Sequence, residues 1–317
     1  MARVALDAMG GDHAPQQTVR GALDAVDRGV DVVLVGDEES LAAELASHGA
    51  DLPIVHAAQT ITMADDPASA IREKKDASIS VAARLVADGE CAGIVSAGST
   101  GAALAAAAIV IGRVKGVSRP AIATIFPLGH PAVVLDAGAN LDVRPEHLAQ
   151  FAVMGSLVAE VYLGVANPKV GLLNIGEESG KGRDLEREAF PLLGDCGVNF
   201  VGNVEGRDVG SGLADVFVTD GFTGNVFLKT AEGTARAVAA VVAELLDGDG
   251  GGLSWLEELR HRIDPEAYGG AHLVGTKGTV VIAHGSSSHR AIANALAMAA
   301  EGAEKGMVER VEAGIDG

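Results

Sequence analysis

The sequence predicts an α/β protein with a mostly parallel β-sheet flanked by helices. Short runs rich in Val and Ile alternate with longer Ala-rich segments along all 317 residues, which is typical of parallel strands buried on both faces with helices crossing between them. Hydrophobic residues make up 48% of the chain and aromatic residues only 3%, so we expect a core of Ala, Val, Leu and Ile. No repeat or long linker divides the chain. This indicates a single compact domain over residues 1–317, with two lobes around a cleft.

The expected strands are the short β-branched runs, several of which end in a glycine or a small polar residue. In chain order they cover residues 3–6, 32–35, 54–56, 93–96, 121–126, 132–135, 170–174, 200–201, 216–219 and 280–284. The Ala-rich segments have the length and spacing of helices, expected at residues 18–28, 41–47, 79–87, 100–111, 145–162, 184–193, 223–246, 255–263 and 287–302. At the carboxyl edge of such a sheet, loops and helix N-termini gather to bind ligands.

The chain carries 24 basic and 43 acidic side chains, a formal net charge of −19. Nucleic acid is therefore not expected as a partner, because affinity for a phosphate backbone needs clustered Lys and Arg. Cys91 and Cys196 are isolated in the sequence, which argues against a disulfide framework or a zinc ribbon. The sequence shows no apolar signal segment and no apolar run of the about 20 residues that a spanning helix needs. We expect a cytoplasmic protein.

Two loops after expected strands combine glycines with polar residues. At residues 7–15, paired glycines lie beside two carboxylates, Asp7 and Asp12, and the imidazole of His13. This pattern fits a tight turn with Asp12 as a cap better than a metal site, because the ligands are too few. At residues 96–101, hydroxyls and backbone amides precede an Ala-rich segment. That loop is either an anion cradle at a helix N-terminus or simply a capped helix start.

Three familiar motifs are incomplete or missing. Residues 98–101 supply only the second half of a GxGxxG dinucleotide fingerprint, and residues 176–182 are one residue short of a nucleotide phosphate-binding loop. No GxSxG elbow occurs, so a covalent serine mechanism is disfavoured. Polar residues follow several further strands, at residues 135–140, 174–178, 202–206 and 220–225. They predict a wide polar cleft for a small anion and a longer substrate.

A series of sequence blocks occurs in one order from the first strand to the last helix. The blocks are DAMGGDHAP at 7–15, REKKDASI at 72–79, SAGSTGA at 96–102, LDAGAN at 135–140, QFAVMG at 150–155, LLNIGEESGKG at 172–182, FVGNVEGRD at 200–208, VTDGFTGNVFLK at 218–229 and HGSS at 284–287. Together they resemble the acyl carrier protein:phosphate acyltransferase family, known as PlsX, of bacterial phospholipid synthesis.

The resemblance implies a reaction, a fold and partners. A fatty acyl group would pass from acyl carrier protein to inorganic phosphate, and the acyl phosphate would pass to a downstream membrane glycerol-phosphate acyltransferase. The implied fold is similar to that of isocitrate dehydrogenase and phosphotransacetylase, in a homodimer without a metal or other cofactor. The chain departs from the expected blocks at Ser99, Ala77 and His272, where Asn, Ser and Pro are expected. Ser99 still offers a hydroxyl to an anion, and none of the three departures removes a charge.

The expected mechanism is direct attack by phosphate, because phosphate dianion is nucleophilic at neutral pH and the enzyme need only position it and stabilise the oxyanion. We assign the phosphate to the loop Gly98, Ser99, Thr100 and Gly101, with Lys181 as the neighbouring cation. The alternative for Lys181 is an exposed loop lysine with no role in binding.

Further polar residues are candidates for contact with the acyl thioester. We expect Asn140, Asn225 and the backbone amides after Gly176 to donate hydrogen bonds to the thioester oxygen. His284 or Asp220 would protonate the departing thiolate or orient the phosphate, although a thiol of pKa about 8.5 leaves with little help. His284 also suits a polar lining or a helix cap.

A basic patch is expected to meet the carrier protein. Carrier proteins of this family are acidic, so an enzyme with net charge −19 needs a local basic surface if repulsion is not to slow their encounter. Arg72, Lys74 and Lys75 form the densest basic cluster. An ordinary solvated face is the alternative, because acidic residues interrupt the cluster.

The region 223–263 is expected to form an amphipathic helical hairpin around the glycine-rich residues 248–252. The first helix carries apolar residues at helical spacing, which fits a homodimer interface and core packing equally well. In residues 255–263, one apolar stripe is flanked by arginines, and its members are Trp255, Leu256, Leu259 and Ile263. It would bind an anionic membrane surface weakly, making the protein peripheral on the inner face of the cell membrane, or pack on the rest of the chain.

Two other functions stay open at this stage. One is a nicotinamide-linked dehydrogenase of similar fold, against which the missing fingerprint counts. The other is a non-catalytic scaffold of lipid synthesis.

Overall fold

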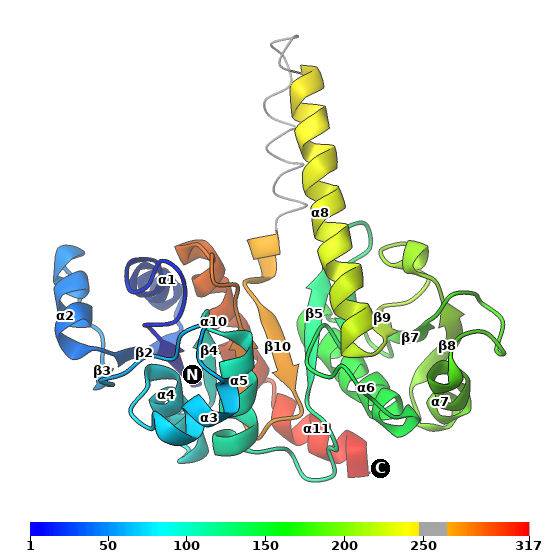
Figure 1. The fold of residues 1–317 in the computed structure, drawn as a ribbon, viewed down its shortest axis with the longest axis horizontal. Coiled ribbons are helices and arrows are strands. Elements are labelled where there is room, and N and C mark those ends of the chain that lie inside the picture. Colours follow the sequence, from blue (N-terminus) through cyan, green and yellow to red (C-terminus); the bar gives the residue numbers. More distant parts are fainter. Residues whose placement is uncertain (247–264, 317) are drawn as a thin grey trace. The chain divides into compact units, whose positions relative to one another are not determined.

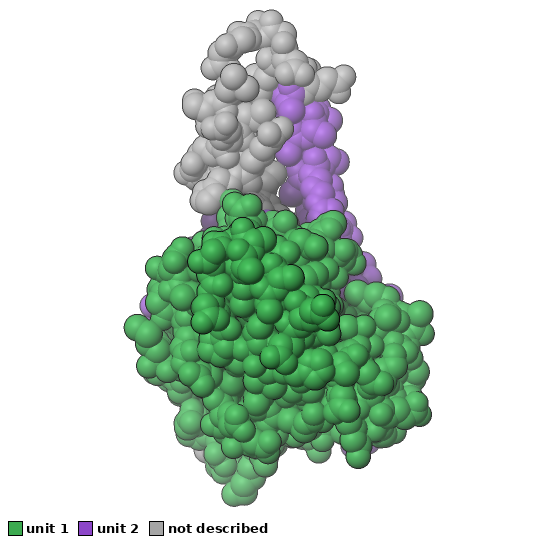
Figure 2. Space-filling view, turned by 90° about the vertical axis from the view of Figure 1, so that its left-hand side faces the viewer, with its two compact units in different colours: residues 1–120, 268–317 green, residues 121–267 purple. Residues whose placement is uncertain are grey.

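The structure is a computed structural model that describes residues 1–246 and 265–316. The chain divides into two compact units, one made of residues 1–120 and 268–317 and the other of residues 121–267 (Figure 2). The first unit is thus built from both ends of the chain. Residues 255–263, the expected second helix of the hairpin, lie outside the described residues.

A mostly parallel sheet forms the centre of the first unit. Its strands, in spatial order, are β3 (Ile54–His56), β2 (Asp31–Gly36), β1 (Arg3–Asp7), β4 (Gly93–Ser96), β11 (Thr279–Ile282) and β10 (Ala271–Val274). Only the pair β10 and β11 is antiparallel among these neighbours. The register sets Asp7 beside Ser96 and Ser96 beside Ile282. The loops that follow β1, β4 and β11 therefore start at one edge of the sheet.

Helices cover this sheet. They are α1 (Gln16–Asp27), α2 (Glu38–Ser47), α3 (Pro67–Glu73), α4 (Ser78–Ala87), α5 (Thr100–Ala106) with a π-helical continuation (Ala107–Ile111), α10 (His289–Glu304) and α11 (Met307–Asp316). Helices α1 and α10 pack against each other. Gly21 permits this contact, because a Cβ at that position would lie 2.6 Å from Cβ of Ile292.

The strands of the second unit are, in spatial order, β5 (Ala121–Phe126), β6 (Ala132–Leu135), β9 (Val216–Val218), β7 (Lys169–Leu173) and β8 (Asn199–Val204). All neighbours are parallel except the hairpin of β5 and β6. Its helices are α6 (Pro145–Val158) with a π-helical continuation (Ala159–Leu163), α7 (Asp184–Asp195) and α8 (Gly221–Leu246), and short 3₁₀ turns occur at Gly206–Asp208 and Pro265–Tyr268. The predicted fold class, a mostly parallel α/β sheet flanked by helices, is confirmed.

Helix α8 is the long helix of the predicted hairpin, and it starts two residues earlier than expected (Figure 1). Leu228, near its start, is buried in a cluster with Phe126 and Phe217. Farther along, the side chains of Val238 and Val241 are 55% and 56% exposed. Packing against the described part of the chain therefore does not account for these two side chains.

The main differences from the expected elements are short segments. β10, α3 and α11 were not predicted, and β8 extends over six residues where two were expected. Gly202 has φ +100° within β8, and the pairing of β7 with β8 shifts register nearby, so the alternation that marks a strand is interrupted there. Among the described residues, we find no helix that is both long and apolar enough to cross a membrane.

Candidate active site

Three loops converge at one edge of the first unit's sheet. The backbone N–H of Asp12 donates to the carbonyl of Gly285 at 2.8 Å, which joins the loop after β1 to the loop after β11. A Cβ at Gly10 would lie 2.9 Å from the backbone N of Gly98, so the loops after β1 and β4 can approach only because glycine stands there. The loops at 7–15, 96–101 and 284–287 therefore form one cluster.

Asp7, which the sequence placed in an Asp/His cluster but not among the predicted site residues, lies beneath this group of loops. Its carboxylate is buried and accepts a hydrogen bond from the Ser96 hydroxyl at 2.7 Å. The Ser96 Oγ accepts in turn from the backbone N–H of Gly98 at 3.1 Å. Burial raises the pKa of Asp7 above its usual range, and the nearby hydroxyls act in the opposite direction. An Asp that ends a buried strand just before paired glycines was the signal in the sequence.

The predicted anion loop is a capped helix start in this structure. Ser99 is the N-cap of α5, and its hydroxyl accepts from the backbone N–H of Ala102 at 3.4 Å. Thr100 is exposed and Gly98, Ser99 and Gly101 are partly exposed. A Cβ at Gly101 would lie 2.7 Å from Cγ of Pro67 in α3. The loop thus satisfies the capping interpretation, and its use by phosphate stays a prediction.

His284 lies in the third loop of this cluster and is exposed. Its Nδ1 accepts the backbone N–H of Ser286 at 3.2 Å and lies 2.8 Å from the Ser286 hydroxyl. An Nδ1 that accepts an N–H places the proton of the neutral ring on Nε2. The imidazole can therefore present an N–H donor to a substrate.

Lys74 and Lys75 follow α3 and differ in their contacts. The ammonium of Lys74 binds the Asp65 carboxylate at 2.8 Å. Together with Thr62 it lowers the pKa of Asp65 to about 2. Lys75 is exposed. Of the predicted basic cluster, Arg72 and Lys75 are therefore the more available cations.

In the second unit, the loop after β6 wraps around the carboxylate of Asp136, which sequence analysis also missed. This fully buried group accepts backbone N–H donors from Ile122 and Gly138 at 3.1 Å, Ala139 at 2.9 Å and Asn140 at 2.8 Å. The Asn140 side-chain amide donates to the same carboxylate at 2.8 Å. The predicted substrate donor Asn140 thus uses one of its two amide hydrogens to hold its own loop.

Asn225 lies in the first turn of α8 and is exposed. Its Oδ1 is 3.6 Å from the position that a Cβ at Gly138 would occupy. The backbone N–H of Gly221 donates to the carbonyl of Asn140 at 2.8 Å, which joins the start of α8 to the loop after β6. Asn225 is therefore held beside that loop with its amide accessible.

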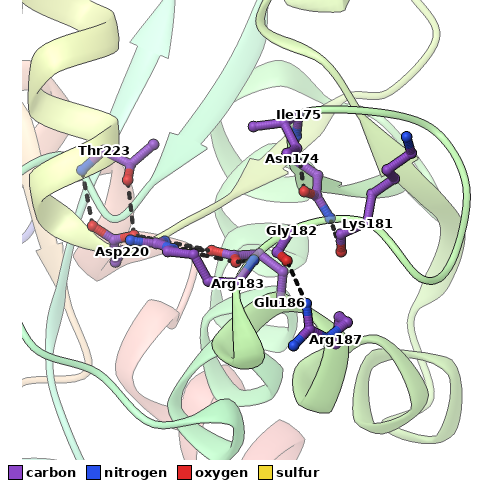
Figure 3. A network of polar contacts seen from close by, with 9 residues as sticks. All are labelled: Asn174, Ile175, Lys181, Gly182, Arg183, Glu186, Arg187, Asp220 and Thr223. Atoms are coloured by element: carbon purple, nitrogen blue, oxygen red, sulfur yellow. Dashed lines mark hydrogen bonds and ion pairs between the residues drawn. The ribbon is translucent and has the colours of Figure 1, made fainter.

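The loop after β7 carries Lys181 (Figure 3). The Asn174 amide donates to the carbonyl of Lys181 at 3.1 Å, and its Oδ1 accepts the N–H of Ile175 at 2.8 Å. The Lys181 ammonium lies 3.9 Å from Glu178, and both side chains are at least half exposed. A surface ion pair of this kind contributes little to stability, so the Lys181 ammonium is available to bind an anion. Gly176 is buried, close to the side chain of Lys181.

Arg183 connects this loop to the start of α8 and was not predicted as a site residue. Its guanidinium binds Glu186 at 2.9 Å and Asp220 at 2.5 Å (Figure 3). Burial alone would raise the pKa of Asp220, but Arg183 and the N–H and hydroxyl of Thr223 outweigh it and hold the pKa below the usual range. Glu186 and Asp220 together raise the pKa of Arg183. Asp220 is therefore ionised and does not suit the role of a proton donor.

The predicted residues gather in two sets, one in each unit. His284 lies close to the loop from Gly98 to Gly101 in the first unit. Lys181, Gly176, Asn140, Asn225 and Asp220 lie on joined loops in the second unit. All follow the carboxyl ends of strands, which is where parallel sheets bind their ligands.

Known proteins match this chain over nearly its whole length. A family model described as "Fatty acid synthesis protein" matches residues 2–310. A relative named phosphate acyltransferase from Desulforamulus reducens is 48% identical, covering 100% of this chain and 98% of the relative. One of the same name from Thermus thermophilus is 50% identical, covering 98% and 97%.

Solved structures share the fold at low sequence identity. A phosphotransacetylase from Streptococcus pyogenes superposes with a TM-score of 0.66 at 18% identity, covering 96% of this chain and 94% of its own. A 4-hydroxythreonine-4-phosphate dehydrogenase from Klebsiella pneumoniae gives 0.54 at 14% identity, covering 96% and 98%. At these identities the likeness shows the fold alone.

Fold and relatives together define an α/β enzyme of the acyltransferase class. The chain belongs to the fatty acid synthesis protein family, whose relatives reported above are named phosphate acyltransferase. The resemblance of its sequence blocks is thereby confirmed. These names support neither a dehydrogenase nor a non-catalytic scaffold.

Proposed function

We propose that the enzyme transfers a fatty acyl group from the thioester of acyl carrier protein to inorganic phosphate, forming an acyl phosphate. Family membership carries this proposal. The second unit adds an observation that fits an acyl substrate: large apolar side chains stand exposed directly beside its polar loops. They are Leu141, Ile175 and Phe222, with 69%, 81% and 61% of their surface exposed.

The chemistry asks for positioning and charge stabilisation. Phosphate is its own nucleophile, so no covalent intermediate on the enzyme is needed. The groups proposed to bind phosphate are the hydroxyls and backbone amides of the loop from Gly98 to Gly101 in the first unit and the Lys181 ammonium in the second unit. The Asn225 amide and the backbone amides after Gly176 donate to the thioester oxygen as negative charge develops there.

The departing thiolate needs only a weak proton donor. His284 is assigned this role, because its Nδ1 accepts the N–H of Ser286 and its Nε2 can then carry the proton. Asp220 acts instead by orienting its neighbours, because Arg183 keeps it ionised. Asn140 supports the loop after β6 through its bonds to Asp136 and stays a proposed donor to the thioester oxygen.

Partners and location follow from the same proposal. The acyl phosphate would serve a downstream membrane glycerol-phosphate acyltransferase, so a cytoplasmic enzyme with weak contact to the inner face of the membrane fits the reaction.

A homodimer through α8 is supported by the exposed Val238 and Val241. Val238 also lines a groove of about 560 Å³, whose other described lining residues are Leu128 and uncharged residues of α8.

The reaction is tested by incubating the purified enzyme with acyl carrier protein thioester and phosphate, and measuring free thiol. Release that depends on phosphate concentration, with acyl phosphate found by mass spectrometry, is the expected result. Release at the same rate without phosphate would show a thioesterase and contradict the proposal.

Sedimentation of wild type and Val238→Glu at micromolar concentration tests the dimer, because a charge in the interface should give monomers.

A further inference from the structure

We propose that Arg183 is a positioning residue of this enzyme, which fixes the loop carrying Lys181 against the start of α8. The inference rests on the proposed function, because it concerns how the phosphate-binding lysine is held. In Figure 3 the side chain of Arg183 extends from the end of that loop toward Asp220, with Glu186 beside it. Arg183 itself need not touch the substrate.

The two carboxylates that Arg183 binds are nearly excluded from water. The side chains of Glu186 and Asp220 are 7% and 3% exposed. They belong to different elements, since Glu186 is in the first turn of α7 and Asp220 precedes α8. Burying a carboxylate costs free energy unless a cation and hydrogen bonds compensate its charge. Arg183 supplies that charge to both and so ties α7 to α8.

The connection from Arg183 back to Lys181 has little freedom. The backbone N–H of Arg183 donates to Glu186 at 2.7 Å, so its main chain and side chain are both held. Gly182 stands between the two cations with φ +95°, where a Cβ would lie 2.6 Å from Oδ1 of Asn174. Asn174 in turn holds the carbonyl of Lys181 at 3.1 Å. A displacement of Arg183 is therefore transmitted to the backbone of Lys181.

The net charge around Arg183 explains why this residue positions the loop and does not itself bind phosphate. One guanidinium faces two carboxylates, so the cluster of Arg183, Glu186 and Asp220 carries a net charge of −1. Such a cluster does not attract a further anion. Among the described residues, Lys181 forms an ion pair with Glu178 alone, at 3.9 Å on the surface, and keeps its charge for the phosphate.

The test compares Arg183→Gln with Arg236→Gln. Arg236 is an exposed arginine of α8 that also pairs with a glutamate, Glu232 at 3.8 Å, and serves as the matched control. We expect kcat of Arg183→Gln to fall by about tenfold or more, as misplacement of reacting groups does, while KM for phosphate stays within about threefold. The control should keep wild-type values. Arg183→Lys keeps the charge without the fork that bridges both carboxylates, and should lie between wild type and Arg183→Gln.

A pH profile separates positioning from a purely structural role. Arg183 helps to hold the pKa of Asp220 below its usual range, so without it that pKa should rise and kcat of Arg183→Gln should decrease on acidification in a range where wild type stays constant. A purely structural role would reduce the folded fraction but leave the pH profile of kcat of the folded enzyme unchanged. An unchanged pH profile would therefore overturn the proposal. A large rise in KM for phosphate with unchanged kcat would also overturn it, since Arg183 would then contact phosphate.

The remaining outcomes are also decisive. If Arg183→Gln does not fold, Arg183→Lys is measured, and a wild-type kcat there would contradict the proposal. Failure of both variants to fold would assign Arg183 to stability and refute positioning. Wild-type enzyme without phosphate-dependent thiol release would refute the proposed function, which is a result distinct from any ratio of variant to wild type.

Discussion

Buried His272 on β10 makes the stability of the protein depend on pH. The residue is 2% exposed, and burial lowers its pKa to about 4 from the usual 6.5. The folded protein keeps the ring neutral at pH values where the unfolded chain takes up a proton. The free energy of unfolding should therefore be constant above about pH 6.5 and decrease as the pH falls toward 4, by roughly 3 kcal/mol in total.

Denaturant unfolding at pH 7 and pH 5 would measure this effect. At pH 5 the histidine should account for about 2 kcal/mol of the loss, a part that His272→Gln lacks. The exposed His48 provides the control variant, His48→Gln. Carboxylates also titrate in this range, so the difference between variants is the informative quantity. Equal acid sensitivity of wild type and His272→Gln would disprove the assignment.

Lys181 is the residue on which phosphate affinity should depend most. Its ammonium is half exposed and only weakly paired, and a charge-assisted hydrogen bond contributes about 1.5–3 kcal/mol. Lys181→Ala should thus raise KM for phosphate by roughly tenfold or more and leave KM for the acyl carrier nearly unchanged. Steady-state kinetics with phosphate varied would show this. Lys115→Ala, which removes a more exposed lysine, is the control, and equal phosphate dependence in both variants would remove Lys181 from the site.

The residue scale also shows which site residues a sequence can reveal. Lys181 and Asn225 were predicted because they stand in polar loops directly after strands. Arg183 and Asp7 were not, because their importance comes from partners 37 and 89 positions away in the chain. Residue type and spacing give no measure of such contacts.

At the scale of elements, the loop after β6 depends on one carboxylate. Asp136 accepts five N–H donors, and an amide in its place would turn an N–H toward other N–H groups. Asp136→Asn should therefore lower the free energy of unfolding by roughly 3 kcal/mol and reduce kcat, since the loop adjoins Asn225. Chemical denaturation and turnover would be measured together. Asp142→Asn, at an exposed position of the same loop, should change neither, and a stable, active Asp136→Asn would contradict this role.

Elements with a continuous apolar run were predicted well, and elements interrupted by polar residues were not. Buried parallel strands such as β1 and β4 appear as continuous apolar runs, so their type and place follow from the sequence. β10 contains a histidine and only four residues, and its pairing with β11 identifies it as a strand. The seven-residue α3 is defined by the Asp66 cap and Pro67, signals too local to outweigh the polar sequence around them.

At the scale of the whole molecule, the division into two units could not be read from the sequence. The last 50 residues join the first 120 because β11 pairs with β4, a contact between strands more than 180 positions apart. No change of composition marks the two crossings between the units. Two lobes were expected, and their bounds needed the structure.

The protein carries a net charge of −19, which should affect its encounter with an acidic carrier protein. Long-range repulsion slows such an encounter unless a local patch of opposite sign guides it. Within the predicted patch, Arg72 and Lys75 are the cations expected to meet the carrier protein, because Lys74 is held by Asp65 at 2.8 Å. Reversing Lys74 would break that ion pair and confuse docking with local stability.

The double variant Arg72→Glu with Lys75→Glu should lower the association rate of the carrier by about tenfold at low salt, and the difference should shrink as salt screens the charges. Arg20→Glu with Lys277→Glu changes the net charge by the same amount, from −19 to −23, at two other exposed positions. Stopped-flow binding of both double variants therefore separates a local patch from total charge. Equal slowing in both would mean that only the overall charge matters, and no slowing in either would remove electrostatic guidance from the encounter.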